Sequence, residues 1–490
     1  MLTFSRTVVI GAAVWLAASI ASAAAGSASV LEAVKAGHVP AVRAALKDPA
    51  AVKVHEADGT TALHWAARND DVNMARLLLQ AGADPNAANR YGVTPLSLAA
   101  VNGSAAVIQA LVKAGADPNA ALREGQTILM TAARTGNVEA VRLLLEAGAD
   151  ANASEHWLGE TALMWAAAQN HAGAVDALAG HGARLDARSA LSTIPTLRAA
   201  GIGIITMEFP KGGWTALMYA AREGALDSTR ALARAGADLN AAGPDGITPL
   251  MLAIVNGHYD VASALLDAGA DPDQADQSGM TALYAAVDMH TPVWMQGRPD
   301  SRPSGALDEV DIVRALLARG ARVDATLTAP LVQRNHTAGD AGLGQGATPL
   351  MRAAKSGDAD LIRLLLEKGA DPSMVLANHT TALMLAAGMT WRDGGGAFPT
   401  RDRATDEGTL DTMTVLLARG LDINAVNDAG DTALHGAVQR GSAVIIRFLA
   451  AHGAKLDVKN ALGRTPLDAA LNRRERDAAV AALRAVVGDR

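Results

Sequence analysis

Two stretches of the sequence combine tryptophan with arginine, the residue types that recur at the centres of protein interfaces. One carries Trp294, Arg298 and Arg302, and the other carries Trp391, Arg392, Phe398 and Arg401. An indole or a guanidinium buries a large area while its polar end still forms hydrogen bonds. We therefore predict that both stretches bind another protein. In the alternative interpretation, each tryptophan packs on its own part of the chain and the arginines are solvated.

The residues that catalysis or metal binding would require do not form a recognisable pattern. There is no cysteine, which excludes thiol catalysis and disulfides, and none of the 12 histidines has a second histidine four positions away. The acidic run 271–279 lacks the glycine and the closing glutamate of a calcium loop. The glycines at 342–346 follow no strand, so they do not predict a phosphate site. We expect no cofactor, no metal and no enzymatic activity.

The overall charge argues against nucleic acid as a partner. The chain has 490 residues and a formal net charge of −7 at pH 7, without the basic stripe that binding to a phosphate backbone requires. Half of the residues are hydrophobic but only 3% are aromatic. This composition is typical of helices that pack closely through alanine and leucine.

A repeated unit positions these residues. Its anchoring threonines are Thr61, Thr94, Thr127, Thr161, Thr215, Thr248, Thr281, Thr348, Thr381, Thr432 and Thr465, and seven of the ten steps between them are 33 or 34 residues. In the copy from Gly125 to Asn152, the threonine can cap a first helix, a glycine ends it, and a more apolar second helix follows. A unit this short cannot bury its own apolar face, so neighbouring copies must stack.

The copies resemble the ankyrin repeat. Motifs such as Thr-Ala-Leu-His-Trp-Ala-Ala at 61–67 and Leu-Leu-Leu-Gln-Ala-Gly-Ala-Asp-Pro-Asn at 77–86 carry the resemblance, which extends from about residue 28 to 488. It implies an all-α solenoid of about 12 helix pairs with short β-hairpin fingers, used to bind proteins. Only His64 and His435 keep the usual histidine, and methionine replaces it in copies such as the one containing Met130. We expect apolar packing there in place of a hydrogen bond between repeats.

The resemblance also implies where a partner binds. The variable surface of the family consists of finger tips and the ends of the first helices. Carried over by phase, it includes Arg90, Tyr91, Arg123, Glu124, Trp157 and Trp214. Of these, the aromatic residues are the strongest candidates for anchors.

Insertions interrupt the repeats at several places. We expect a degenerate capping repeat at 28–57, regular repeats at 58–187, an extended finger at 188–211, repeats with inserted loops at 212–459, and a C-terminal capping repeat at 460–490. The glycines and β-branched residues of 188–211 predict a long β-hairpin that folds back on the repeats. The inserted loops cover 290–307, 326–346 and 390–407. The first and third each add 18 residues between the two helices of a repeat and should project from one edge.

The first residues are typical of a secretory signal peptide. Arg6 precedes an apolar run, and Ala21 and Ala23 provide the small residues of a cleavage site. We expect a signal peptide at 1–23, cleavage near Ala23, and a periplasmic or secreted protein without stable membrane insertion. An uncleaved anchor remains the alternative.

Taken together, the sequence predicts a periplasmic scaffold that binds another protein, with the inserted loops giving partner specificity. The sequence leaves two alternatives open. In one, the chain is an accessory or regulatory subunit of a periplasmic enzyme, such as a redox enzyme. In the other, its loops bind a small molecule or carry hydrolytic chemistry.

Overall fold

The computed structural model describes residues 30–200, 203–290, 304–329, 343–390, 404–471 and 477–488. Within these ranges the chain forms two compact units. Unit 1 comprises residues 30–190, 214–220 and 227–237, and unit 2 comprises the remainder of the described residues. The division falls within the repeat formed by α11 (Ala216–Glu223) and α12 (Leu226–Ala235).

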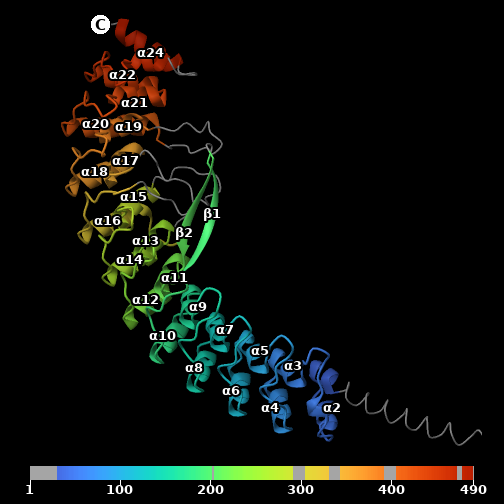
Figure 1. The fold of residues 1–490 in the computed structure, drawn as a ribbon. Helices are drawn as coiled ribbons and strands as arrows, with labels where there is room; N and C mark the ends of the chain where they lie inside the picture. Colours follow the sequence, from blue (N-terminus) through green and yellow to red (C-terminus); the bar gives the residue numbers. More distant parts are fainter. Residues whose placement is uncertain are drawn as a thin grey trace, which may run out of the picture. The chain divides into compact units, whose positions relative to one another are not determined.

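Unit 1 consists of helix pairs in two rows (Figure 1). A helix at 30–35, α2 (Val39–Ala45) and η1 (Ala51–Lys53) form the first repeat. The first helices that follow are α3 (Ala62–Arg68), α5 (Pro95–Asn102), α7 (Ile128–Thr135) and α9 (Ala162–Ala168). The second helices are α4 (Val72–Gln80), α6 (Ala105–Lys113), α8 (Val138–Glu146) and α10 (Ala172–Gly180). Each helix packs on the helix of the same row in the next repeat.

Unit 2 repeats this arrangement and contains the two strands. Its first helices are α13 (Pro249–Val255), α15 (Ala282–His290), α17 (Pro349–Lys355), α19 (Ala382–Ala387), α21 (Ala433–Arg440) and α23 (Pro466–Leu471). Its second helices are α14 (Tyr259–Asp267), α16 (Glu309–Ala318), α18 (Ala359–Glu367), α20 (Asp406–Ala418), α22 (Ala443–Ala451) and α24 (Asp477–Gly488). Strands β1 (Ser192–Ala200) and β2 (Gly203–Lys211) pair antiparallel, with Ser192 opposite Lys211. A hairpin therefore lies where the glycines and β-branched residues predict it.

Threonine caps start the first helices, as the sequence predicts. The Thr127 hydroxyl accepts a hydrogen bond from the Met130 amide at 3.2 Å, and the Thr248 hydroxyl accepts one from the Met251 amide at the same distance. Losing such a cap typically costs about 1 kcal/mol. Proline follows the cap at the first helical position of α5, α13 and α17, where its missing N–H has no helical partner to lose.

Histidine and methionine behave differently at the same repeat position. The His64 Nδ1 atom accepts from the Thr61 amide at 3.1 Å, which leaves Nε2–H to donate to the Val93 carbonyl of the next finger at 2.9 Å. Burial lowers the pKa of His64, which favours this neutral form. Met130 is fully buried, and its sulfur lies 3.4 Å from the Thr127 amide. Methionine thus keeps the contact within the repeat but has no donor for the next finger.

A second series of hydrogen bonds joins successive repeats beside the second helices. The Asn119 side chain donates to the Gly148 carbonyl at 3.0 Å and accepts from the Asp150 amide at 2.8 Å. Asn86 and Asn152 form the same pair of bonds in unit 1. In unit 2, Asn424 also forms both bonds, whereas Asp324 stands at this position in another repeat and accepts from the Asp371 amide at 3.1 Å. A carboxylate has no N–H, so it cannot make the donating half of this link.

Candidate protein-binding surface

The regular finger turns of unit 1 hold aromatic and basic side chains out in solvent. In the second finger, the side-chain oxygen Oδ1 of Asn89 accepts hydrogen bonds from the backbone amides of Tyr91 and Val93 at 3.0 and 3.1 Å. This fixes the turn and leaves the Tyr91 side chain 55% exposed. The Arg90 guanidinium lies 4.7 Å from the centre of the Tyr91 ring, within the range of a cation–π contact.

The finger at Trp157 is one residue longer and uses a different turn. The buried Glu155 carboxylate accepts hydrogen bonds from the amides of Trp157, Leu158 and Glu160 at 2.6, 2.7 and 3.0 Å. The Glu155 side chain thus fixes this longer turn, as the Asn89 side chain fixes the regular one. It leaves Trp157 82% exposed at the tip. Such exposure of an indole is unusual for a residue with no binding role.

Fingers and first helices of unit 1 form one continuous surface, because side chains of α3, α7 and α9 bond to the fingers that precede them. The Trp65 indole donates to Glu56 at 3.2 Å, and the Trp165 indole donates to Glu160 at 2.9 Å. Between them, the Gln126 amide donates to the Thr131 hydroxyl at 2.9 Å. We call this surface the finger face. It is defined by the residues Trp65, Arg68, Arg90, Tyr91, Leu98, Val101, Arg123, Thr131, Arg134, Trp157 and Trp165.

An apolar pocket of about 120 Å³ opens in the middle of the finger face. Leu98 and Val101 of α5 and Thr131 of α7 form one side, and Leu122 and Gln126 of the finger form the other. The pocket exists because side-chain size varies at one repeat position. The neighbouring repeats carry Trp65 and Trp165 there, whereas these two repeats carry the smaller Leu98 and Thr131. A partner side chain the size of leucine would fit this volume.

Two arginines occupy the repeat position of the pocket residue Val101, one in the repeat before it and one in the repeat after it. Arg68 lies over the Trp65 ring at 5.3 Å, and Arg134 lies over the Trp165 ring at 5.7 Å. Both are exposed, and neither forms an ion pair with a carboxylate of the described residues. By contrast, the carboxylates of Glu56 and Glu160 already accept from indoles. The indoles also fix the orientation of the two guanidinium groups.

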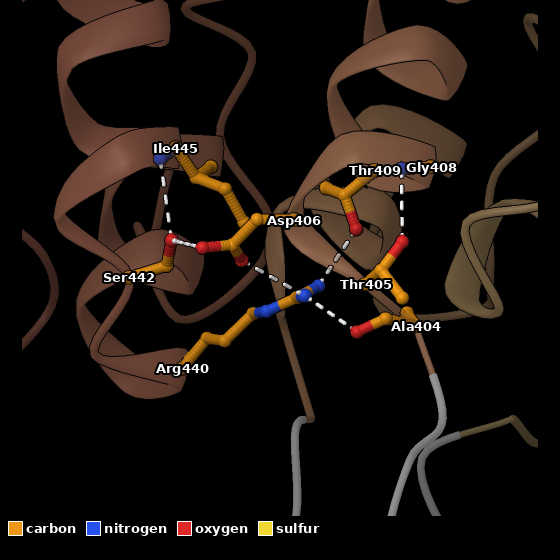
Figure 2. Close-up of polar contacts among 8 residues, drawn as sticks. All are labelled: Ala404, Thr405, Asp406, Gly408, Thr409, Arg440, Ser442 and Ile445. Atoms are coloured by element: carbon orange, nitrogen blue, oxygen red, sulfur yellow. Dashed lines mark hydrogen bonds and ion pairs between the residues drawn. The ribbon is translucent and has the colours of Figure 1, made fainter.

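In unit 2, buried polar contacts hold the two ends of the third inserted loop (390–407). Figure 2 shows the Arg440 side chain reaching Ala404, Asp406 and Thr409, at 2.7 Å to the carbonyl, 3.1 Å to the carboxylate and 2.8 Å to the hydroxyl. This guanidinium is only 6% exposed. At the other end of the loop, the Thr390 amide donates to the Gln439 side chain at 3.3 Å. Helix α21 therefore holds both ends.

The ends of the first inserted loop (290–307) are held as well. His290 lies 2.8 Å from Asp358, and Asp288 lies 2.5 Å from the buried Arg352. On the returning side, the Ser304 amide donates to the Gly257 carbonyl at 3.1 Å. The hydrogen bond that the His290 ring donates to the Asp358 carboxylate raises the pKa of His290. Burial would raise the pKa of Asp358, but hydrogen bonds from His290 and the Leu361 amide lower it overall.

The structure places some of the residues that the sequence singles out. Arg90, Tyr91, Arg123, Glu124 and Trp157 are exposed at finger tips of unit 1. Trp214 is half-buried and packs edge-on against Tyr219 at 5.6 Å, so its role as an anchor stays a prediction. The following predicted residues lie outside the described ranges: Trp294, Arg298, Arg302, Trp391, Arg392, Phe398 and Arg401.

Sequence reasoning placed the ends of the first helices on this surface but missed Trp65 and Trp165. Trp65 and Trp165 sit at the helical position after the histidine or methionine, where a bulky indole among small residues could have marked it. It also missed Arg440, because only the folded structure brings this residue to the returning end of the third loop.

Helix pairs stacked in two rows, with fingers joining each pair to the next, define a helical repeat protein. Models of ankyrin repeats (3 copies) match residues 30–121, 115–189, 217–329, 307–391 and 403–484. The chain therefore belongs to the ankyrin-repeat family, as its sequence predicts. Ankyrin repeats mediate binding between proteins.

Several curated relatives match parts of the chain. Cyclin-dependent kinase 4 inhibitor B from Bos taurus is 37% identical over 149 residues, which cover 30% of this chain and 97% of the relative. B-cell lymphoma 3 protein homolog from Mus musculus is 30% identical over 130 residues, or 26% of this chain. Ankyrin repeat and SOCS box protein 16 from the same species is 33% identical over 124 residues. This chain spans only a quarter of the length of each of the two mouse proteins.

Two observations complete the description of the site. No helix among the described residues combines the length and hydropathy needed to cross a membrane. In the same part of the chain, no three histidine, aspartate or glutamate side chains come together in a group that could hold a metal ion.

Proposed function

We propose that this chain is a scaffold that binds another protein through the finger face of unit 1, and that it acts by recognition without catalysis. The observation that carries the proposal is the apolar pocket between α5 and α7, on a face whose finger tips expose Tyr91 and Trp157. The turns that present Tyr91 and Trp157 are fixed by side-chain acceptors, so little ordering entropy is lost on binding. The bovine relative is named as an inhibitor of another protein, which agrees with a binding role.

We further propose that the first and third inserted loops give partner specificity. Polar contacts hold both ends of each loop, and those of the buried Arg352 and Arg440 hold one end of the first and of the third loop. A loop without a function would not require buried charges at its ends, since burying a charge is costly unless it is paired.

Export to the periplasm is the third part of the proposal. Its support is the sequence at 1–23, which lies outside the described residues. Fractionation of cells that produce the full chain, followed by N-terminal sequencing, tests it. We expect a periplasmic protein that begins just after Ala23. A cytoplasmic protein that retains Met1 would refute export.

Site-specific photo-crosslinking tests the binding surface. A photoreactive amino acid replaces Val101 or Tyr91 on the finger face, or Glu139 on α8 as the control. We expect both finger-face positions to crosslink one partner protein, and the α8 position to crosslink none. Deleting residues 291–303 and 391–403 should then change which partner is captured. Equal crosslinking from Glu139 would rule out the finger face as the site.

A further inference from the structure

The finger face also indicates the chemistry of the segment that it binds. We propose that the partner presents an extended acidic segment, in which one apolar side chain enters the pocket and carboxylates to either side bind Arg68 and Arg134. This inference rests on the proposed binding role of the finger face and adds the class of its ligand.

The charge distribution supports an acidic ligand. Arg68 and Arg134 occupy the same repeat position, two repeats apart, and Val101 lies at that position between them. Each guanidinium stacks on an indole, at 5.3 and 5.7 Å, which leaves its N–H edge free for a carboxylate. Neither has a carboxylate partner within the described residues, although the chain as a whole is acidic. A site with unpaired cations on an acidic protein selects for carboxylates through charge complementarity.

The spacing supports an extended segment. Helices of neighbouring repeats pack about 8–10 Å apart, which places the two arginines about 16–20 Å apart. An extended chain advances about 3.3 Å per residue, so about five or six residues span this distance. The pocket opens between the repeats of Leu98 and Thr131, so the apolar residue would fall between the two acidic ones.

Synthetic peptides test this chemistry with the full-length chain. The probe is a fluorescein-labelled peptide of about ten residues, with glutamates about five positions apart and one leucine between them. Two analogues carry lysine in place of glutamate, or alanine in place of leucine. Binding is measured by fluorescence anisotropy at low and high salt. We expect the glutamate–leucine peptide to bind, salt to weaken it, and both analogues to bind at least about fivefold more weakly.

Matched variants assign the effect to particular residues. Arg68→Glu and Arg134→Glu should each weaken the probe at least about fivefold, because each replaces an attraction by a repulsion. Arg76→Glu makes the same charge change on the exposed side of α4 and should leave binding unchanged. Leu98→Trp copies the residue that Trp65 and Trp165 carry at this position, so it should fold normally while filling the pocket. It should abolish the advantage of leucine over alanine in the peptide.

The outcomes separate this inference from the proposed function. Failure of the glutamate peptide to bind, equal binding of the lysine analogue, or an equal effect of Arg76→Glu would overturn the acidic-segment proposal. If a captured partner still crosslinks at Val101 while these results are negative, the binding role stands and only the ligand class is wrong. If no partner crosslinks at the finger face, the proposed function itself fails.

Discussion

The first helices of unit 1 and unit 2 carry the same repeat but present different surfaces. Trp65, Leu98 and Trp165 in unit 1 are half-exposed, whereas Leu252, Arg352 and Leu385 occupy the same position in unit 2 and are at most 2% exposed. One turn further, Arg68 and Arg134 are open to solvent, while Lys355 in unit 2 is 3% exposed. The repeat therefore fixes where a side chain stands, but the packing of each unit decides whether that side chain is exposed or buried.

The largest expected effect comes from the buried arginine of unit 2. Arg352→Met removes the partner of Asp288, which lies 2.5 Å away, and should destabilise unit 2 by about 3 kcal/mol. Its control, Arg68→Met in unit 1, should change stability by less than about 0.5 kcal/mol. Hydrogen exchange of the amides of α17 and α3 measures the two opening free energies. Similar values for both variants would remove the distinction between the units.

A smaller loss is expected where the third loop returns. Arg440→Ala deletes three hydrogen bonds from a guanidinium that is 6% exposed, so α20 should open about 2 kcal/mol more easily. Limited proteolysis should then cut residues 390–407 faster. Arg447→Ala, at an exposed position of α22, serves as the control. Unchanged cleavage in Arg440→Ala would show that these contacts do not hold the loop end.

Exchanging the residues that link successive repeats sharpens the comparison. Asn119→Asp removes the donor to the Gly148 carbonyl and should destabilise unit 1 by about 1 kcal/mol. Asp324→Asn in unit 2 keeps the acceptor for the Asp371 amide and should change stability by less than about 0.5 kcal/mol. Urea unfolding monitored by circular dichroism compares the two variants. A larger loss in Asp324→Asn would show that the carboxylate is required there.

The smallest effect concerns pH. His290 has a raised folded pKa, so its contribution to stability is complete below the unfolded value of 6.5 and is lost as pH rises through the folded pKa. Asp358 has a lowered folded pKa, so its contribution is present above 3.8 and is lost as pH falls through the folded pKa. The free energy of unfolding of unit 2 should therefore decrease as pH rises through the folded pKa of His290 and as pH falls through the folded pKa of Asp358. In His290→Gln, a decline at high pH as steep as in the unaltered chain would contradict this assignment.

Much of the fold follows from the sequence, because its signals are local. Thr127, the glycines that end the helices and the period of 33 residues each act within one repeat or between neighbours. The exposed fingers at Tyr91 and Trp157 follow in the same way. Burial of Arg352 does not, because its partner Asp288 lies 64 residues away in the sequence. Only tertiary contacts in unit 2 decide that it is buried.

Part of the candidate site was also predictable, because its finger tips are set by local sequence signals. The finger tips could be located by phase, but the pocket arises from the difference in size between Leu98 and Thr131 and the flanking Trp65 and Trp165. Trp214 directly precedes its threonine, as Gln126 and Glu160 do, and it packs on Tyr219. Local sequence cannot distinguish an aromatic side chain that packs inward from one that faces solvent.

Hydroxyl-radical footprinting of the complex with the captured partner tests most directly whether unit 1 offers the open binding surface. Oxidation is measured for Tyr91, Trp157 and Trp165, with and without the partner. We predict that partner binding protects all three, and that the buried Met289 and Met384 of unit 2 react little in either state. If the three finger-face residues remain fully reactive in the complex while protection is confined to unit 2, the finger face of unit 1 is not the binding surface.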